Sequence, residues 1–278
     1  MAMPQHLVMV RHGESVHNEL NSRPPGDDSD DSSEILDLTP NWKFRLTPTG
    51  VDQAQQSGEF LARQMGRFGL ALSDLRVLAS DYVRAVETAA NSCMTMQNIR
   101  PGEALPEIRL EPRLRERHWG PYGKLNRKSQ KEKHPDTFRE RHDNPGLWVP
   151  DGGDESMQSM QNRFRNLLDT LHRMGEPKMV VLFSHGEFMT AAKAVIEKAN
   201  LADYSNPDYS IQNCGILWYT RVNPAQQAST DQSDFLRWRL SYNIKGYEDG
   251  TWADIGNAVT KAYSPQELLY YVNENGAN

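Results

Sequence analysis

The sequence feature that most constrains the fold is a short apolar run near the N-terminus that ends abruptly in polar residues. The run is Leu7–Val10, and Arg11, His12 and Gly13 follow it directly. A run this short, with β-rich flanks, favours a buried strand over a helix. Ligands of open α/β sheets bind beyond the carboxyl ends of the strands, so we expect Arg11 and His12 to lie in a binding site.

The residues that follow this run suit a phosphate group. An arginine such as Arg11 can hold a phosphate through two parallel hydrogen bonds. An imidazole such as His12 can act as a nucleophile or as a base near neutral pH. Gly13 lets the backbone come close to a bound group. The segment therefore predicts a site for a phosphorylated ligand.

Two more buried strands are predicted to end in residues that could join this site. The strand Val77–Ser80 leads into a helix that carries Arg84 in its first turns, where free N–H groups already attract anions. The fully apolar run Met179–Phe183 is followed closely by a second histidine, His185.

The other predicted elements are a helix that starts at Val16–Asn18, a helix capped by Thr47, an edge strand at Ile108–Leu110, a helix over 157–171, a strand at 216–221 with a hairpin partner near 235–242, and a last helix from Ser264.

Glu116 is a candidate proton donor. It lies among Arg115, Arg117 and His118. Positive neighbours lower the pKa of a carboxyl group, whereas burial and a bound phosphate raise it. A carboxyl group that delivers a proton to a leaving alcohol needs such tuning. The alternative is that Glu116 only neutralises the arginines beside it.

Two segments differ in charge from the rest of the chain, whose formal net charge is −6. Residues 22–38 hold six acidic residues and one basic residue, Arg23. We expect a solvated mobile loop there, and an acidic flap over the site is the alternative. Residues 113–142 hold ten Lys and Arg against four acids. This basic segment could form a lid that concentrates anions, an exposed amphipathic helix or a docking patch for a polyanion.

Composition narrows the class of protein. The 278 residues suit one large α/β domain or two small ones. The two cysteines, Cys93 and Cys214, form neither a metal cluster nor a disulfide framework, which favours a reducing compartment. The chain has no signal-peptide region and no membrane-length apolar run, so we expect a cytoplasmic protein. We expect no nucleic-acid or membrane partner, and a homodimer stays open.

Several motifs together resemble the histidine phosphatase superfamily (branch 1), which includes cofactor-dependent phosphoglycerate mutases. They are RHGES at 11–15, LTPTGxxQA at 46–54, SxxxRAxETA at 80–89, LxERxxG at 114–120, PxGGxES at 150–156 and SHGE at 184–187. The resemblance implies a three-layer αβα sandwich, with a mostly parallel central sheet and helices on both faces. It implies one catalytic domain over 1–278, with the acidic insert at about 22–38, a basic lid at about 113–150 and a C-terminal extension at about 243–278.

The resemblance also implies roles for individual residues. His12 would attack phosphorus and become phosphohistidine, while Glu116 would protonate the leaving oxygen. The residues implied to bind the phosphate are Arg11, His12, Asn18, Arg84 and His185. Residues implied to contact the rest of the substrate are Ser15, Tyr122, Lys124, Gly186 and Glu187. Neither a metal nor another cofactor is expected.

The resemblance covers both mutases and phosphatases, and we expect a phosphatase that acts on a small anionic phosphorylated metabolite. RERHWG with Tyr122 and Lys124 favours a 2,3-bisphosphoglycerate-dependent mutase. Glu187 argues against it, because an acid there would repel a substrate carboxylate. The separated Arg139 and Arg141 and the acidic insert also depart from the mutase pattern. A non-catalytic phosphate-binding module is a further alternative, although every expected catalytic residue is present.

Overall fold

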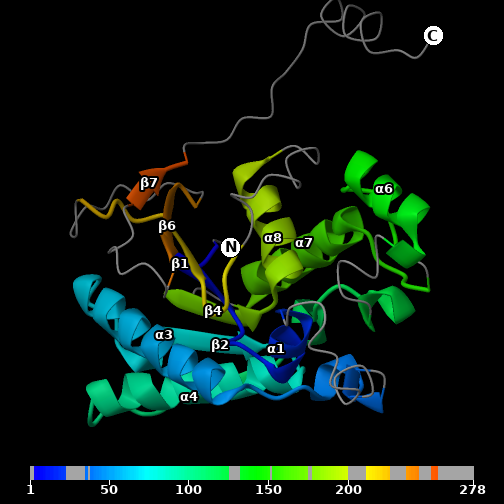
Figure 1. Ribbon diagram of the computed structural model, residues 1–278. Helices are drawn as coiled ribbons and strands as arrows, with labels where there is room; N and C mark the ends of the chain where they lie inside the picture. The colour runs from blue at the N-terminus through cyan, green and yellow to red at the C-terminus, as the bar shows by residue number, and fades with distance from the viewer. Residues whose placement is uncertain are drawn as a thin grey trace, which may run out of the picture.

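A computed structural model describes residues 3–22, 35–36, 38–124, 132–150, 152–174, 177–199, 211–225, 236–243 and 252–255 of the chain. This part of the chain forms a seven-stranded sheet in the order β3-β2-β4-β1-β5-β6-β7 (Figure 1). The strands are β1 (His6–Arg11), β2 (Leu75–Ala79), β3 (Ile108–Leu110), β4 (Met179–Ser184), β5 (Ile216–Thr220), β6 (Trp238–Tyr242) and β7 (Trp252–Asp254).

The sheet has a parallel part and an antiparallel part. Strands β3, β2, β4 and β1 run parallel to one another, whereas β5, β6 and β7 pair antiparallel from β1 outward. The central pair is β1 and β4, in which Arg11 lies opposite Ser184. The carboxyl ends of these two strands therefore meet at the same edge of the sheet.

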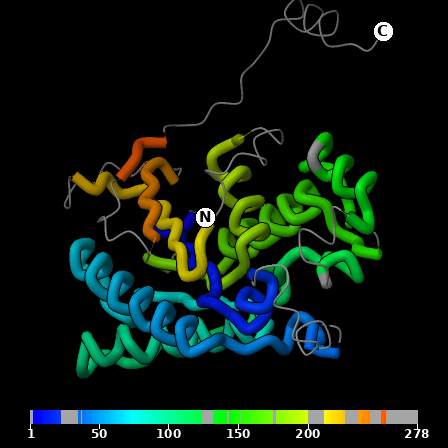
Figure 2. Tube along the Cα trace, in the orientation of Figure 1, coloured from blue at the N-terminus to red at the C-terminus, as the bar shows by residue number. Residues whose placement is uncertain are grey.

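Helices cover both faces of this sheet. α3 (Pro48–Arg67) and α4 (Val83–Ile99) pack together on one face, and α7 (Met157–Arg173) and α8 (Gly186–Glu197) pack together on the other (Figure 1). The tube in Figure 2 follows the N-terminal strand into the middle of the molecule. Shorter elements are α1 (Val16–Ser22), α6 (Pro135–Asp143) and the single 3₁₀ turns η1 (Asn41–Lys43), η2 (Leu72–Asp74), η3 (Pro112–Leu114) and η4 (Gly120–Lys124).

Alternate residues of the central strands build two separate cores. In β1, Val8 and Val10 join the cluster under α3 and α4, whereas Leu7 and Met9 join the cluster under α7 and α8. Successive strand side chains point to opposite faces, so one continuous apolar run serves both cores. β1 is apolar on both faces for this reason, which confirms the prediction of a buried strand.

The structure bears out the predicted sandwich and most of its predicted elements. Thr47 caps α3 by accepting a hydrogen bond from the backbone N–H of Gly50, with Pro48 as the first helical residue. Ser156 caps α7 in the same way, through the N–H of Ser159. β7 was not predicted. Most of the acidic insert expected at about 22–38, and the helix expected from Ser264, lie outside the described residues.

Within the described residues, no helix combines the length and the apolar character that a membrane crossing requires.

His6 gives a test of this core through pH. Its buried ring accepts a hydrogen bond from Trp218 Nε1 at 3.2 Å, and burial, aided by Arg221, lowers the pKa of His6 to about 4. The unfolded chain takes up this proton near pH 6.5, so the stability that neutral His6 confers is lost as pH falls from about 6.5 toward 4. When pH is lowered from 7 to 5, the free energy of unfolding of His6→Asn should fall by about 2 kcal/mol less than that of the parent chain.

Urea unfolding at the two pH values measures this difference. The half-exposed His172 on α7 offers the matched control, as His172→Asn. An equal change of the pH dependence in both variants would contradict the assignment to His6.

Candidate active site

The two histidines at the strand ends lie side by side. His12 follows β1 and His185 follows β4, and their ring centroids are 5.1 Å apart. The backbone N–H of His12 donates to the carbonyl of Ser184, which ties the two strand ends together. Both rings are buried, at 3% and 0% exposure. The parallel pairing of β1 with β4 thus creates the pair that the sequence predicted.

The hydrogen bonds of His12 define its tautomer. Its Nδ1 lies 2.7 Å from the carbonyl oxygen of Gly13, which can only accept, so Nδ1 carries the proton. Its Nε2 accepts a hydrogen bond from Nε of Arg84 at 3.1 Å. Burial, and then the charges of Arg84 and Arg11, lower the pKa of His12 well below its ordinary value. The ring is therefore neutral at pH 7, with its Nε2 lone pair on the side of Arg84.

Arg84 connects this histidine to a loop that follows the acidic insert. Its Nη1 donates to the backbone oxygen of Asn41 at 2.6 Å and to Oδ1 of the same residue at 3.1 Å. Tyr82 lies over the guanidinium, with 5.0 Å between Cζ and the ring centroid. Arg84 is 3% exposed, and burial lowers its pKa to about 10. It remains a cation at pH 7, at the N-terminal end of α4.

Two buried polar atoms at the site have no hydrogen-bond partner among the described residues. One is Nε of Arg11, whose Nη1 donates to the carbonyl of Ile211 at 2.6 Å. The other is Nδ1 of His185, whose Nε2 lies 2.9 Å from Oγ of Ser80. Buried polar atoms are rarely left unpaired unless a ligand or a water completes them. An anion with several acceptor oxygens, bound by Arg11 and Arg84, would suit these two atoms.

Gly13 and Gly186 make room for this arrangement. A Cβ atom on Gly13 would lie 2.4 Å from the carbonyl oxygen of Gly50, so no larger residue fits there. A Cβ atom on Gly186 would lie 3.3 Å from Nε of Arg11, against the guanidinium. Both glycines follow a site histidine directly. The repeated His-Gly pair therefore has a steric reason at each strand end.

Ser15 and Asn18 form a polar turn next to His12. Oδ1 of Asn18 accepts from the backbone N–H of Ser15, from its hydroxyl and from Nδ2 of Asn213. Nδ2 of Asn213 also donates to the backbone oxygen of His12. Three donors orient the Asn18 amide, and they leave its NH₂ group without a hydrogen bond in the described part of the chain. The NH₂ group is a donor that could serve a ligand.

Glu116 lies on the other side of the two arginines, between η3 and η4. Its Oε1 accepts the N–H of the next residue, Arg117, at 2.9 Å. Burial lowers the pKa of Arg11 and of Arg84, and the charge of Glu116 opposes that effect at both arginines. Glu116 and Tyr82 line one cavity of about 470 Å³. The carboxyl group thus acts electrostatically on both arginines and faces a space that a ligand could enter.

Glu187, in the first turn of α8, is held between two arginines of the basic segment. Its carboxylate lies 3.7 Å from Nη1 of Arg117 and 3.6 Å from Nη2 of Arg141. Arg117 is buried beside Trp148, with Cζ 4.9 Å from the ring centroid. Burial raises the pKa of Glu187 to about 7, although both arginines oppose the shift. Glu187 therefore links the basic segment to the helix that begins after His185.

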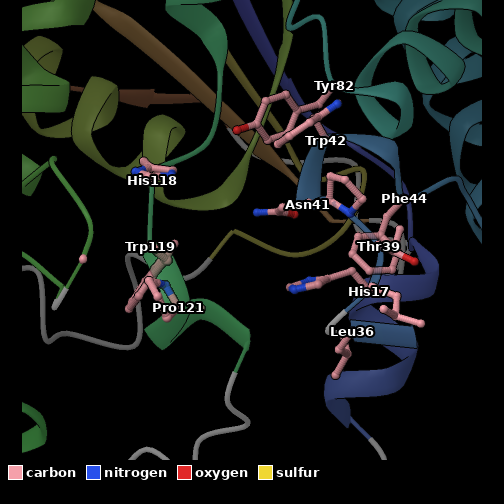
Figure 3. Close-up of a pocket in the computed structure, with 15 residues that line it drawn as sticks. His17, Leu36, Thr39, Asn41, Trp42, Phe44, Tyr82, His118, Trp119 and Pro121 are labelled. Carbon is pink, nitrogen blue, oxygen red and sulfur yellow. The ribbon is translucent and has the colours of Figure 1, made fainter. Parts of the chain in front are cut away.

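A second cavity, of about 460 Å³, opens beside Arg84. One wall comes from His17 on α1 and from the segment Thr39–Phe44, and the other from His118, Trp119 and Pro121 (Figure 3). Asn41 and Tyr82, which both contact Arg84, belong to its lining. This cavity was not predicted from the sequence. Its lining comes from five separate segments, and only the packing brings them together.

Other predicted residues occupy different positions. Ser15 is buried in the polar turn, and Tyr122 is buried against Trp119 and Trp148. Lys124 ends η4, and its side chain lies outside what the structure describes. None of the residues predicted to contact the rest of the substrate is among the described residues that line the two cavities. Their substrate contacts stay predictions.

The basic segment is largely engaged with the protein itself. Arg113 binds Glu111 at 2.7 Å, Arg115 binds Asp81, and Arg163 of α7 donates to the backbone oxygen of Arg115. Residues 125–131 lie outside the described part, so the basic lid as a whole stays a prediction.

Within the described residues, no group of three or more His, Cys, Asp and Glu side chains could hold a metal ion.

Comparison with known proteins gives a consistent family. The model of the histidine phosphatase superfamily (branch 1) matches residues 7–228. The metal-independent phosphoserine phosphatase of Arabidopsis thaliana is 28% identical over 203 residues, which cover 70% of each chain. The 2,3-bisphosphoglycerate-dependent phosphoglycerate mutase of Clavibacter sepedonicus is 32% identical over 178 residues, which cover 62% of this chain and 60% of that protein.

Solved structures agree with this assignment. A mycobacterial glucosyl-3-phosphoglycerate phosphatase in complex with VO3 superimposes with a TM-score of 0.57 and 25% identity, over 78% of this chain and 91% of that chain. A phosphoserine phosphatase from Entamoeba histolytica, with TM-score 0.55 and 19% identity over 79% and 92% of the two chains, shares the fold.

The raised pKa of Glu187 predicts an unusual pH dependence. The folded chain keeps this proton up to about pH 7, whereas the unfolded chain releases it near pH 4.5, so the cost of burying the charge grows as pH rises between these values. The stability of Glu187→Gln relative to the parent chain should therefore increase from pH 5 to pH 8. Denaturant unfolding at both pH values measures it.

Glu155→Gln is the matched control. Glu155 accepts two hydrogen bonds from Arg163, at 2.8 and 2.7 Å, so this variant should be less stable at both pH values. A Glu187→Gln variant that loses more stability at pH 8 than at pH 5 would mean that the ion pairs outweigh the cost of burial.

Proposed function

The chain belongs to the histidine phosphatase superfamily, and we propose that it is a metal-independent phosphomonoester hydrolase that acts through a phosphohistidine intermediate. The observation that carries the proposal is the state of His12. Its proton is on Nδ1, its pKa is lowered well below the ordinary value by burial, and its Nε2 lone pair lies next to the Arg84 cation. A neutral imidazole beside a guanidinium is a nucleophile prepared for a phosphate ester.

The first step transfers the phosphoryl group to His12. Nε2 attacks phosphorus in line, the P–N bond forms, and the bond from phosphorus to the alcohol oxygen breaks. Glu116 gives its proton to that oxygen, so the alcohol leaves neutral. Arg11, Arg84 and His185, with the amide of Asn18, hold the non-bridging oxygens. Fixed donors in a buried site stabilise the charge that these oxygens carry in the transition state.

The second step returns the enzyme to its first state. Glu116, now a carboxylate, takes a proton from water, and the water oxygen attacks phosphorus. The P–N bond breaks, inorganic phosphate forms, and His12 regains its Nε2 lone pair. The same carboxyl group thus serves as acid and then as base, which returns its proton within one cycle.

A phosphoglycerate mutase is the alternative, since one relative of the chain carries that name. Mutase and phosphatase differ only in the second acceptor, which is a bound hydroxy acid in one case and water in the other. A mutase must hold the substrate carboxylate throughout. Arg117 and Arg141, which could hold such a group, are already paired with Glu187. These pairings favour water as the acceptor.

Replacement of the nucleophile tests the proposal. His12→Ala should abolish both the turnover of p-nitrophenyl phosphate and the acid-labile phosphoryl label, because Nε2 forms the covalent bond. Rapid-quench labelling and phosphate release measure the two effects. His172→Ala on α7, outside the two cavities, is the control. An acid-labile adduct that survives His12→Ala would falsify the proposal, and binding without turnover in the parent chain would point to a phosphate-binding module.

Replacement of the acid gives a prediction that depends on the leaving group. Glu116→Gln should lower the rate of phosphoryl transfer to His12 about 10²- to 10⁴-fold for an alkyl phosphate, since general acid catalysis contributes that much. The effect on this first step should be much smaller for p-nitrophenyl phosphate, whose leaving oxygen needs no proton. Rapid-quench measurement of phosphohistidine formation from both esters tests this difference, with exposed Glu107→Gln as control. Equal losses on the two esters would assign Glu116 to phosphate binding instead.

A further inference from the structure

The cavity of about 460 Å³ lies beside the proposed phosphate site. Nε of Arg84 contacts His12, while Nη1 of the same side chain contacts Asn41 in the cavity wall. Tyr82 packs on the guanidinium and also lines the cavity. Tyr82 and His118 line both this cavity and the one that Glu116 faces, so an alcohol protonated by Glu116 can extend into this space. The volume suits a small organic group rather than a single water or ion.

The walls of this cavity are aromatic and carry no permanent charge. Trp42, Phe44 and Tyr82 face Trp119 and Pro121 across the space (Figure 3). No Asp, Glu, Lys or Arg belongs to its lining among the described residues. Aromatic rings pack well against flat or ring-bearing groups, and their faces offer nothing that compensates a desolvated anion.

The two histidines of the lining give a substrate carboxylate no unpaired cation. Burial lowers the pKa of His17 to about 4, so its ring is neutral at pH 7. Nδ1 of His118 lies 3.2 Å from a carboxylate oxygen of Asp154, so this histidine already has an acid as its partner. A substrate carboxylate in the cavity would thus meet a neutral ring on one side and a histidine paired with an acid on the other.

Besides Arg84, which the phosphate would occupy, Arg115 in the neighbouring cavity and Arg45 next to Phe44 are already bound to acids. Arg115 binds Asp81 through two hydrogen bonds, and Arg45 binds Glu87. Either arginine could hold a substrate carboxylate only by giving up this partner. The described residues therefore favour an alcohol without a carboxylate.

We infer that the substrate is a phosphate monoester whose alcohol has no acid group and carries a ring, aryl or glycosyl, and that Trp42 is a specificity residue that packs on this ring. The inference rests on the proposed phosphatase function and names the class of alcohol that it releases. Trp42 suits this role because its side chain is half-exposed in the cavity wall and directly follows Asn41, the residue bound to Arg84.

The first test compares four esters that all release an alkyl alcohol, so that the leaving groups are similar. They are 2-phenylethyl phosphate, glucose 6-phosphate, O-phosphoserine and 3-phosphoglycerate. We expect kcat/KM for at least one ring-bearing ester to exceed that for both acid-bearing esters by about tenfold or more. Whichever ring-bearing ester is better identifies the alcohol as aryl or glycosyl. A preference for either acid-bearing ester would overturn the inference and leave the phosphatase intact.

The second test replaces the tryptophan. Trp42→Ala should raise KM for the preferred ring-bearing ester about tenfold or more, with little change for O-phosphoserine. Met94→Ala, an exposed apolar residue on α4 away from the cavity, is the matched control. An equal loss on all esters would assign Trp42 a structural role and overturn the inference. Failure of the parent chain to hydrolyse any phosphomonoester would overturn the proposed function itself.

Discussion

The pairing of β1 with β4 is the interaction on which the rest of the site depends. These two parallel strands lie in the middle of the sheet, and each is apolar on both faces because helices cover both. The chain can leave that apolar environment only at the strand ends, and there it places His12 and His185. The hydrophobic core thus determines where the polar chemistry begins, and the strand register determines which side chains meet.

Burial also determines the electrical state of the site. Arg11, Arg84, His12 and His185 are all withdrawn from water, and burial is the main reason why the pKa of each is lowered. The histidines are consequently neutral, while the arginines remain charged, with a polar atom of Arg11 left unpaired. Such a site is costly without a ligand, since buried charge is poorly compensated. A phosphate dianion would supply the missing negative charge.

The sequence was sufficient to predict the residues proposed to bind the phosphate, but not the cavity beside Arg84. Arg11, His12, Arg84 and His185 each directly follow a strand or begin a helix, so local patterns were sufficient to find them. Trp42 and Phe44 follow the acidic insert, in a stretch without periodicity, and nothing local marks them as a cavity wall. Glu187 was interpreted through its charge alone, whereas the fold places it between Arg117 and Arg141.

The sequence by itself determined the local elements: the apolar runs that become strands, the Thr47 and Ser156 caps, and the residues at each strand end. These depend on contacts between near neighbours in the chain, which is why they can be read from it. The tertiary structure alone decided the contact of Arg84 with His12, the raised pKa of Glu187 and the uncharged cavity beside Arg84. Each of these arises from burial and from partners distant in sequence, such as Asn41 bonded to Arg84, and desolvation exists only once the chain has packed.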